Sequence, residues 1–162
     1  MRLKYISWIP AFIAMIVIFM FSAKPAAQSN NSSVIIAEQV IKCYENITNK
    51  EFDTNVRDDL IDRLNHIVRK SAHFLEYALL AWCIGLHLAV IKLEKRLFFN
   101  AVLLSAVYAV TDEIHQYFVP GRSCQITDVL LDSCGAAVGA FIFILMRIIY
   151  KKVKATVLAR NG

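Results

Sequence analysis

The fold is decided by YISWIPAFIAMIVIFMFSA, residues 5–23, a run without a single charged side chain. An α-helix rises about 1.5 Å per residue, so roughly 20 residues cross a hydrocarbon core of about 30 Å. The apolar part of a signal peptide is shorter, at about 7–15 residues. Lys24-Pro25 follows this run in place of a clear small-residue cleavage site. We therefore expect a retained transmembrane helix.

Three further apolar runs follow, at about residues 71–91, 97–118 and 127–150. The chain of 162 residues is 57% hydrophobic and 19% charged, whereas soluble proteins average about 45–50% and about 25%. This composition excludes a disordered tail, an ordinary soluble enzyme and a set of several domains. We predict a single all-α membrane domain over residues 1–162, built as an integral membrane four-helix bundle.

Basic residues set the expected orientation, because Lys and Arg gather in short cytoplasmic segments. They are frequent before the first span, between the second and third, and after the fourth: Arg2, Lys4, Lys92, Lys95, Arg96, Arg147, Lys151, Lys152, Lys154 and Arg160. The connection between spans three and four holds only Arg122. Both termini are therefore expected in the cytoplasm, and the loop of residues 24–70 outside the cell.

That loop is expected to hold short amphipathic helices. A polar linker at residues 28–33 precedes the first apolar stripe, and a second stripe follows: Ile36, Val40, Tyr44 and Ile47, then Leu60, Leu64, Ile67 and Val68. Such stripes lie on a membrane surface or form the packing face of a loop helix. We favour the packing face.

Ionisable residues inside spans are costly, at about 2.5–3.5 kcal/mol for Asp, Lys or Arg on insertion scales, and they mark functional sites. Helical spacing gathers polar residues on one face of each of the last three spans: Arg69, His73, Glu76 and Tyr77; Asp112, His115 and Gln116, with Glu113 beside them; Asp128 and Asp132. Counted from the outer span ends, Glu76 and Asp112 lie at about 9 Å depth and Asp132 at about 6 Å. We expect one polar pocket that opens to the outside.

Two glycines continue the acidic stripe of the fourth span. Gly135 and Gly139 form a Gly-xxx-Gly pair, which lets helix backbones approach closely in lipid. The expected neighbour is another span of the same chain. A homo-oligomer through Gly135 and Gly139 is the alternative.

These residues together resemble the VanZ-like family of bacterial membrane proteins. The matching pieces are Lys70-x-x-His73-Phe74-x-Glu76-Tyr77, Asp112-Glu113-x-His115-Gln116-x-Phe118-x-Pro120-x-Arg122, Asp128, and Gly135-x-x-x-Gly139. The chain departs from the family pattern at Asp132, where an asparagine is usual, and at residues 21–24, where Phe-Ser-Ser-Gln is common. The resemblance implies a four-helix protein of the bacterial plasma membrane, linked in some members to teicoplanin susceptibility. It implies no established reaction.

Several functions are compatible with the polar pocket. In the favoured one it binds or processes an anionic membrane lipid, such as a polyprenyl phosphate or a lipid-linked cell-wall precursor. Arg122 and Lys70 would anchor the head group, since guanidinium groups bind phosphate bidentately. The candidate ligand-binding residues are Lys70, Tyr77, Gln116, Arg122, Asp128 and Asp132. The candidate acid–base residues are His73, Glu76, Asp112, Glu113 and His115.

The alternatives are a purely structural role, a metal site and a coupled transporter. In the structural role, Arg69, Lys70 and Arg122 would neutralise three of the five acids and lock the bundle. A metal site has only composition in its favour, because no paired-ligand motif is present on any helix. No residue is assigned to a metal, no cofactor is identified, and no nucleic-acid partner is expected. The sequence leaves open whether the protein is an enzyme and whether Cys43 and Cys124 pair.

Overall fold

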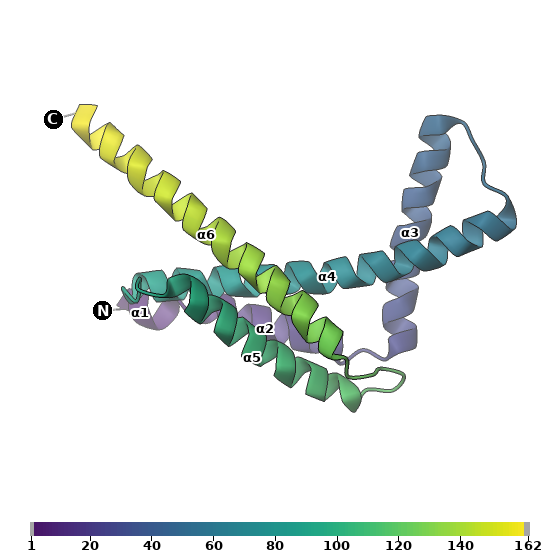
Figure 1. Ribbon diagram of the computed structural model, residues 1–162, viewed down its shortest axis with the longest axis horizontal. Coiled ribbons are helices and arrows are strands. Elements are labelled where there is room, and N and C mark those ends of the chain that lie inside the picture. Colours follow the sequence, from purple (N-terminus) through teal and green to yellow (C-terminus); the bar gives the residue numbers. More distant parts are fainter. Residues whose placement is uncertain (1, 161–162) are drawn as a thin grey trace.

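The structure, a computed structural model, describes residues 2–160, and these form helices and connecting turns without a strand. Figure 1 shows α1 (Arg2–Ile6), α2 (Ile9–Ser22), α3 (Ala26–Thr48), α4 (Thr54–Val90), α5 (Leu97–Tyr117) and α6 (Ile126–Arg160). Four helical segments are long and apolar enough to cross a membrane: Leu3–Ser22, Thr54–Val90, Leu97–Tyr117 and Ile126–Arg160. The prediction of an all-α membrane bundle with four spans is confirmed.

Helix α4 is the centre of the bundle and packs against α2, α3, α5 and α6. Small side chains dominate the contacts, which brings the helix backbones close together. One buried cluster joins α2, α4 and α5, and the other joins α4, α5 and α6. Their members are Ala11, Ala14, Ile18, Tyr77, Leu80 and Ala109, and then Ala81, Leu88, Leu97, Ala101, Ala136 and Ala140.

Two glycines of α6 lie directly against the backbone of α4. A Cβ atom added at Gly135 would lie 2.2 Å from the carbonyl oxygen of Phe74, and one at Gly139 would lie 1.9 Å from that of Ala78. The glycine pair therefore packs against another span of the same chain. A homo-oligomer through this pair would require α4 to leave α6.

The segment between the first two spans is more helical than expected. Residues 28–33, predicted as a linker, belong to α3, which begins after Pro25 and ends at Asn49 in the left-handed region, with φ of 50°. The serine side chains are accommodated because their hydroxyl groups can hydrogen-bond to the backbone one turn earlier in the helix. Ser33 Oγ, for example, donates to the carbonyl oxygen of Ser29 at 3.1 Å. The second predicted loop helix is the beginning of α4, because no proline interrupts residues 54–90.

The packing-face interpretation holds for part of the first apolar stripe. Helix α3 buries Ser33, Ala37 and Ile41 where it packs against α4. Val40 and Tyr44 are about half exposed and line a groove shared with α4, and Tyr44 stacks on Phe52 with 5.5 Å between ring centroids. Ile47 is 77% exposed. On α4, Leu60 and Leu64 line a groove against α3, whereas Ile67 is exposed.

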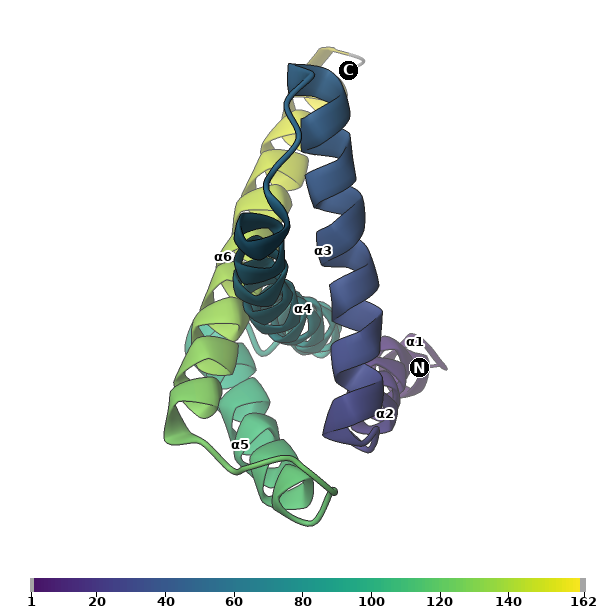
Figure 2. The same cartoon turned by 90° about the vertical axis from the view of Figure 1, so that its right-hand side faces the viewer.

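Helix α3 runs across the end of the bundle. In Figure 1, α2 and α4 extend along the length of the molecule while α3 stands crosswise to them, and Figure 2 shows the same relation from the side. The loop that joins α5 to α6 lies at this end, which we call the α3 end. The N-terminus and the connection from α4 to α5 lie at the opposite end.

Candidate functional site

A buried hydrogen-bond network links α2 to α5 at the α3 end. Ser22 Oγ donates to Asp112 Oδ2 at 2.8 Å, and Gln116 Nε2 donates to the same oxygen at 2.9 Å. These three side chains are buried. Gln116 Oε1 accepts from Arg122 Nη1 at 3.0 Å, so the network reaches the loop after α5.

Hydrogen bonds to the protein fix the position of the Arg122 side chain, and two of its N–H donors make no hydrogen bond within the described residues. It follows Gly121, whose φ of 76° turns the loop back toward the helices. Its Nε donates to the carbonyl oxygen of Lys24 at 3.0 Å, and its Nη2 donates to that of Phe21 at 3.4 Å. Arginine has five N–H donors, so these contacts and the one to Gln116 leave two for a ligand.

Charges of both signs surround Arg122. Burial lowers the pKa of the Arg122 guanidinium from its ordinary value, and the neighbouring charge of Arg69 lowers this pKa further, while the carboxylates of Asp112, Glu113 and Glu76 act in the opposite direction. Neither arginine has an ion-pair partner in the part of the chain that the structure describes. A negative charge between the two would relieve their repulsion.

Of the five acidic residues in the last three spans, few form ion pairs; these five are Glu76, Asp112, Glu113, Asp128 and Asp132. Lys70 Nζ forms an ion pair with Asp128, both side chains being about three-quarters buried. Glu113 Oε2 accepts from the backbone N–H of Gln125 at 2.8 Å. Within residues 2–160, Lys70–Asp128 is the one ion pair between the spans at this level. The structural role, in which cations neutralise three of the five acids, therefore lacks two of its three pairs.

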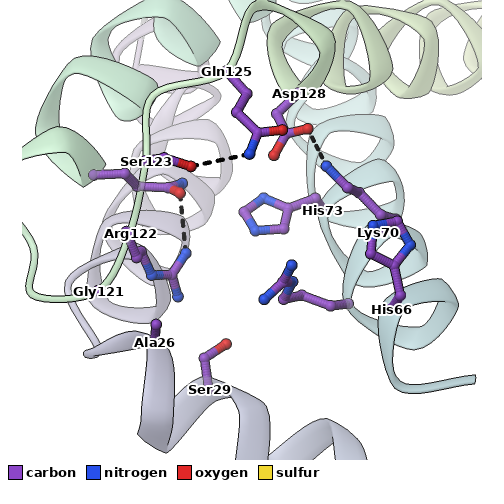
Figure 3. A pocket seen from close by; sticks show the side chains of 12 residues that line it. Ala26, Ser29, His66, Lys70, His73, Gly121, Arg122, Ser123, Gln125 and Asp128 are labelled. Carbon is purple, nitrogen blue, oxygen red and sulfur yellow. Dashed lines mark hydrogen bonds and ion pairs between the residues drawn. The ribbon is translucent and has the colours of Figure 1, made fainter. Parts of the chain in front are cut away.

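A cavity of about 130 Å³ opens beside these groups, between α3, α4 and the loop before α6 (Figure 3). Most of the ionisable side chains that line it are basic, namely His66, Arg69, Lys70, His73 and Arg122. The acid among its lining residues is Asp128, which already pairs with Lys70. We call this space the basic cavity.

A less polar space of about 320 Å³ adjoins the basic cavity between α2, α3 and α4, and we call it the apolar extension. Ser29, Arg69, His73 and Arg122 line both spaces. Phe21, Ile36, Val68 and Ala72 provide the apolar wall of the extension. A cavity lined by basic side chains thus lies next to a mainly apolar one.

The predicted site residues divide into three groups. Lys70, His73, Gln116, Arg122 and Asp128 line the basic cavity, and Glu76 lines the apolar extension. Asp112, Glu113, Tyr77 and Asp132 are fully or nearly buried behind them. His115 stacks on Phe19 with 4.4 Å between ring centroids and lines neither space.

Several buried polar atoms have no partner within the described residues. They include the hydroxyl of Tyr77, both carboxylate oxygens of Asp132 and Nδ1 of His73. Of these three residues, only His73 reaches the basic cavity. Of the predicted acid–base set, the structure therefore brings His73 to the basic cavity and Glu76 to the apolar extension, rather than all five residues.

Sequence reasoning missed His66, Ser29 and Ser22. His66, Arg69, Lys70 and His73 have helical i, i+3, i+4, i+7 spacing, which would have identified His66 if the span had been extended upstream. Ser22 had no such signal, because its role depends on how the end of α2 meets α5. Ser29 lay in the stretch expected to be a linker.

Metal ligation and disulfide bonding were also left open by the sequence. No group of three or more His, Cys, Asp or Glu side chains within residues 2–160 is arranged to hold a metal ion. The metal alternative therefore gains no support. Cys43 and Cys124 are exposed free thiols.

One comparison with known proteins gives a match. The family model described as VanZ/LLP1 matches residues 7–147, which include every side chain that lines the basic cavity. No curated protein and no solved structure matches the chain.

Proposed function

The chain belongs to the VanZ-like family of multi-pass membrane proteins, and from this premise we propose that it binds an anionic membrane lipid through the basic cavity. The lipid class is a polyprenyl phosphate or a lipid-linked cell-wall precursor. One observation carries the proposal: Arg69 and Arg122 line the same cavity without an ion-pair partner among the described residues, while its one acid, Asp128, is paired with Lys70. Two unpaired guanidinium groups on one cavity attract an anion.

The position of the apolar extension next to the basic cavity supports an amphiphile rather than a free anion. Arg69 and Arg122 would bind the phosphate, because guanidinium groups form bidentate charge-assisted hydrogen bonds with it. The apolar extension would take the first part of the hydrocarbon chain, between Phe21 and Ile36. The lateral position of the extension suits a ligand that arrives through the membrane.

The proposed setting is the plasma membrane of a bacterium, with both termini in the cytoplasm and the α3 end outward. This orientation follows from the excess of Lys and Arg at the opposite end. It would present the basic cavity to lipids of the outer leaflet. A link to teicoplanin resistance is a further part of the proposal, tested by measuring susceptibility of cells that express the protein or its Arg122→Gln variant.

Native mass spectrometry of protein extracted from its own membrane tests lipid binding. The unaltered protein should retain a phosphate-bearing lipid, and Arg69→Gln and Arg122→Gln should each lower the retained fraction. Arg147→Gln is the matched control, because Arg147 pairs with Glu94 at the opposite end. Equal retention in all four proteins would contradict the proposal and favour a structural role for the charges.

A second candidate function is chemistry on the bound lipid. It rests on His73, whose Nδ1 has no partner among the described residues, and on Glu76 in the adjoining space. A histidine beside a carboxylate is suited to proton transfer or hydrolysis. Incubation with polyprenyl phosphates should then give a changed product, and Glu76→Gln should abolish turnover while lipid stays bound. Loss of binding together with turnover would favour a binding protein.

A further inference from the structure

The end of the bundle opposite α3 holds another, larger cavity, which we call the N-terminal cavity. It has a volume of about 860 Å³ and lies between α1, α2, α4 and α5. It shares no lining residue with the basic cavity or with the apolar extension. Ligand sites typically measure about 300–1,000 Å³ and have mostly apolar walls with a few polar groups. The N-terminal cavity has both properties.

The walls of the N-terminal cavity meet at the end nearer to α3. There the hydroxyl of Tyr108 on α5 donates to the carbonyl oxygen of Met15 on α2 at 2.6 Å. Two other lining residues, Trp8 and Leu104, are 48% and 50% exposed. The cavity is therefore closed toward α3 and open to the surroundings of the bundle toward the N-terminus.

The N-terminal cavity has the length of one membrane leaflet. Along the first span its lining runs from Lys4 to Met15, which is about 16 Å at the helical rise of about 1.5 Å per residue. The hydrocarbon core measures about 30 Å, so each leaflet contributes about 15 Å. Lys4 lies near the beginning of the span Leu3–Ser22, at the level of the lipid head groups. The cavity therefore matches the acyl chain of one lipid in length.

Three polar side chains in the wall of the N-terminal cavity already have partners within the protein. Besides the Tyr108 hydroxyl, these are His87, whose Nδ1 lies 2.9 Å from Ser7 Oγ, and Thr111, whose Oγ1 donates to the carbonyl oxygen of Tyr108 at 2.7 Å. Apolar cavities stay free of water, so hydrocarbon suits this space better than water does. Lys4, at the open end, forms no ion pair within residues 2–160.

We propose that the N-terminal cavity binds one anionic phospholipid from the leaflet at that end of the bundle. One acyl chain lies between α2 and α5, on a floor formed by Leu80 and Ile84 of α4. The Lys4 ammonium group pairs with the head group, and Tyr5 and Trp8 line the cavity beside it, at the interfacial level that aromatic residues favour. In the orientation proposed above this is the cytoplasmic leaflet, whose anionic lipids attract basic residues next to a span. The site requires no ligand in the basic cavity.

Native mass spectrometry of delipidated protein tests the N-terminal cavity by titration with phosphatidylglycerol or with phosphatidylethanolamine of the same acyl chains. Leu104 and Leu103 form a matched pair, because they are 50% and 62% exposed on α5 and only Leu104 lines the cavity. We expect one phosphatidylglycerol to bind at this site in the unaltered protein and in Leu103→Trp. Binding should be about tenfold weaker in Leu104→Trp, because the indole overfills the space.

The head-group contact is tested by Lys4→Gln in the same titrations. The unaltered protein should prefer phosphatidylglycerol about fivefold, which is the effect of one basic residue near an anionic membrane surface. Lys4→Gln should bind both lipids equally. Arg122→Gln should keep this lipid whether or not the basic cavity binds one, so failure of either site is seen separately.

Three outcomes would overturn the inference. They are equal binding in Leu104→Trp and Leu103→Trp, equal affinity of the unaltered protein for the two phospholipids, and loss of the phosphatidylglycerol in Arg122→Gln. If Leu104→Trp fails to fold, Trp8 is the reporter in Trp82→Phe, because Trp8 lines the cavity and Trp82 does not. Phosphatidylglycerol brominated in its acyl chains should then quench Trp8 fluorescence at an about fivefold lower mole fraction than brominated phosphatidylethanolamine. Coinciding quenching curves would contradict the site.

Discussion

Substitution of Gly139 by alanine should separate the two helices that hold the basic cavity in place. The added Cβ would lie 1.9 Å from the carbonyl oxygen of Ala78, whereas real Cβ contacts are essentially never closer than 3.0 Å. The α4 and α6 backbones must therefore move apart by about 1 Å or more, at an overpacking cost of about 3 kcal/mol. Alanine recovers about 1 kcal/mol through helix propensity. The net loss of about 2 kcal/mol is about 30-fold in the unfolding equilibrium constant.

The assay is denaturant-induced unfolding of the protein in detergent micelles, followed by helical circular dichroism. Gly85→Ala is the matched control, because its Cβ would meet the ring of Phe143 at 2.9 Å and a side chain can move aside. We expect this control to be close to neutral, since the helix-propensity gain offsets a soft contact. If Gly139→Ala were as stable as Gly85→Ala, the close approach of α6 to α4 would be refuted.

Three further substitutions probe the polar contacts in the same unfolding assay. Ser22→Ala removes the donor that lies 2.8 Å from a buried carboxylate of α5, and we expect a loss of about 1–3 kcal/mol; an unchanged midpoint would contradict the network. For Lys70 and Asp128, a double-mutant cycle with Lys70→Met and Asp128→Asn should give a coupling free energy of about 1–2 kcal/mol, between the values for exposed and buried ion pairs. A coupling free energy of zero would contradict the ion pair. At the opposite end, hydrogen bonding and charge from Arg147 lower the pKa of Glu94 below its ordinary value of 4.5. The ionised Glu94 therefore stabilises the fold above that pH, and this contribution is lost as the pH falls through the lowered pKa. Glu94→Gln should flatten that part of the pH–stability profile, and an unaltered profile would refute the contact.

The spans could be predicted from the sequence because lipid imposes a simple rule of length and apolarity. The run at residues 5–23 and the glycine pair at 135 and 139 each correspond to a feature of the structure. Helical spacing also brought Lys70 and His73 to one face, and both line the basic cavity. These are local patterns, and local patterns determine which residues share a helix face.

The rest depends on contacts that spacing does not encode. Ser22 meets Asp112 across 90 positions of sequence, and nothing near Ser22 indicates that contact. His115 satisfied the same spacing rule as Gln116, yet it lies against Phe19, because the rotation of α5 is set by its packing. Within the first apolar stripe, Tyr44 stacks on Phe52 whereas Ile47 is exposed, and their spacing alone does not separate the two. Hydrophobic periodicity shows that a face is apolar, but it does not distinguish a protein partner from lipid.

The central claim is that the basic cavity recognises the phosphate of a membrane lipid. The most direct measurement is a titration of the purified protein in nanodiscs with a polyprenyl phosphate and with the uncharged polyprenol of equal length. We expect binding that requires the phosphate and weakens about 10- to 100-fold in Arg122→Gln, since hydrogen bonds to charged groups contribute about 1.5–3 kcal/mol. Equal binding of the alcohol, or phosphate binding indifferent to Arg122→Gln, would contradict it.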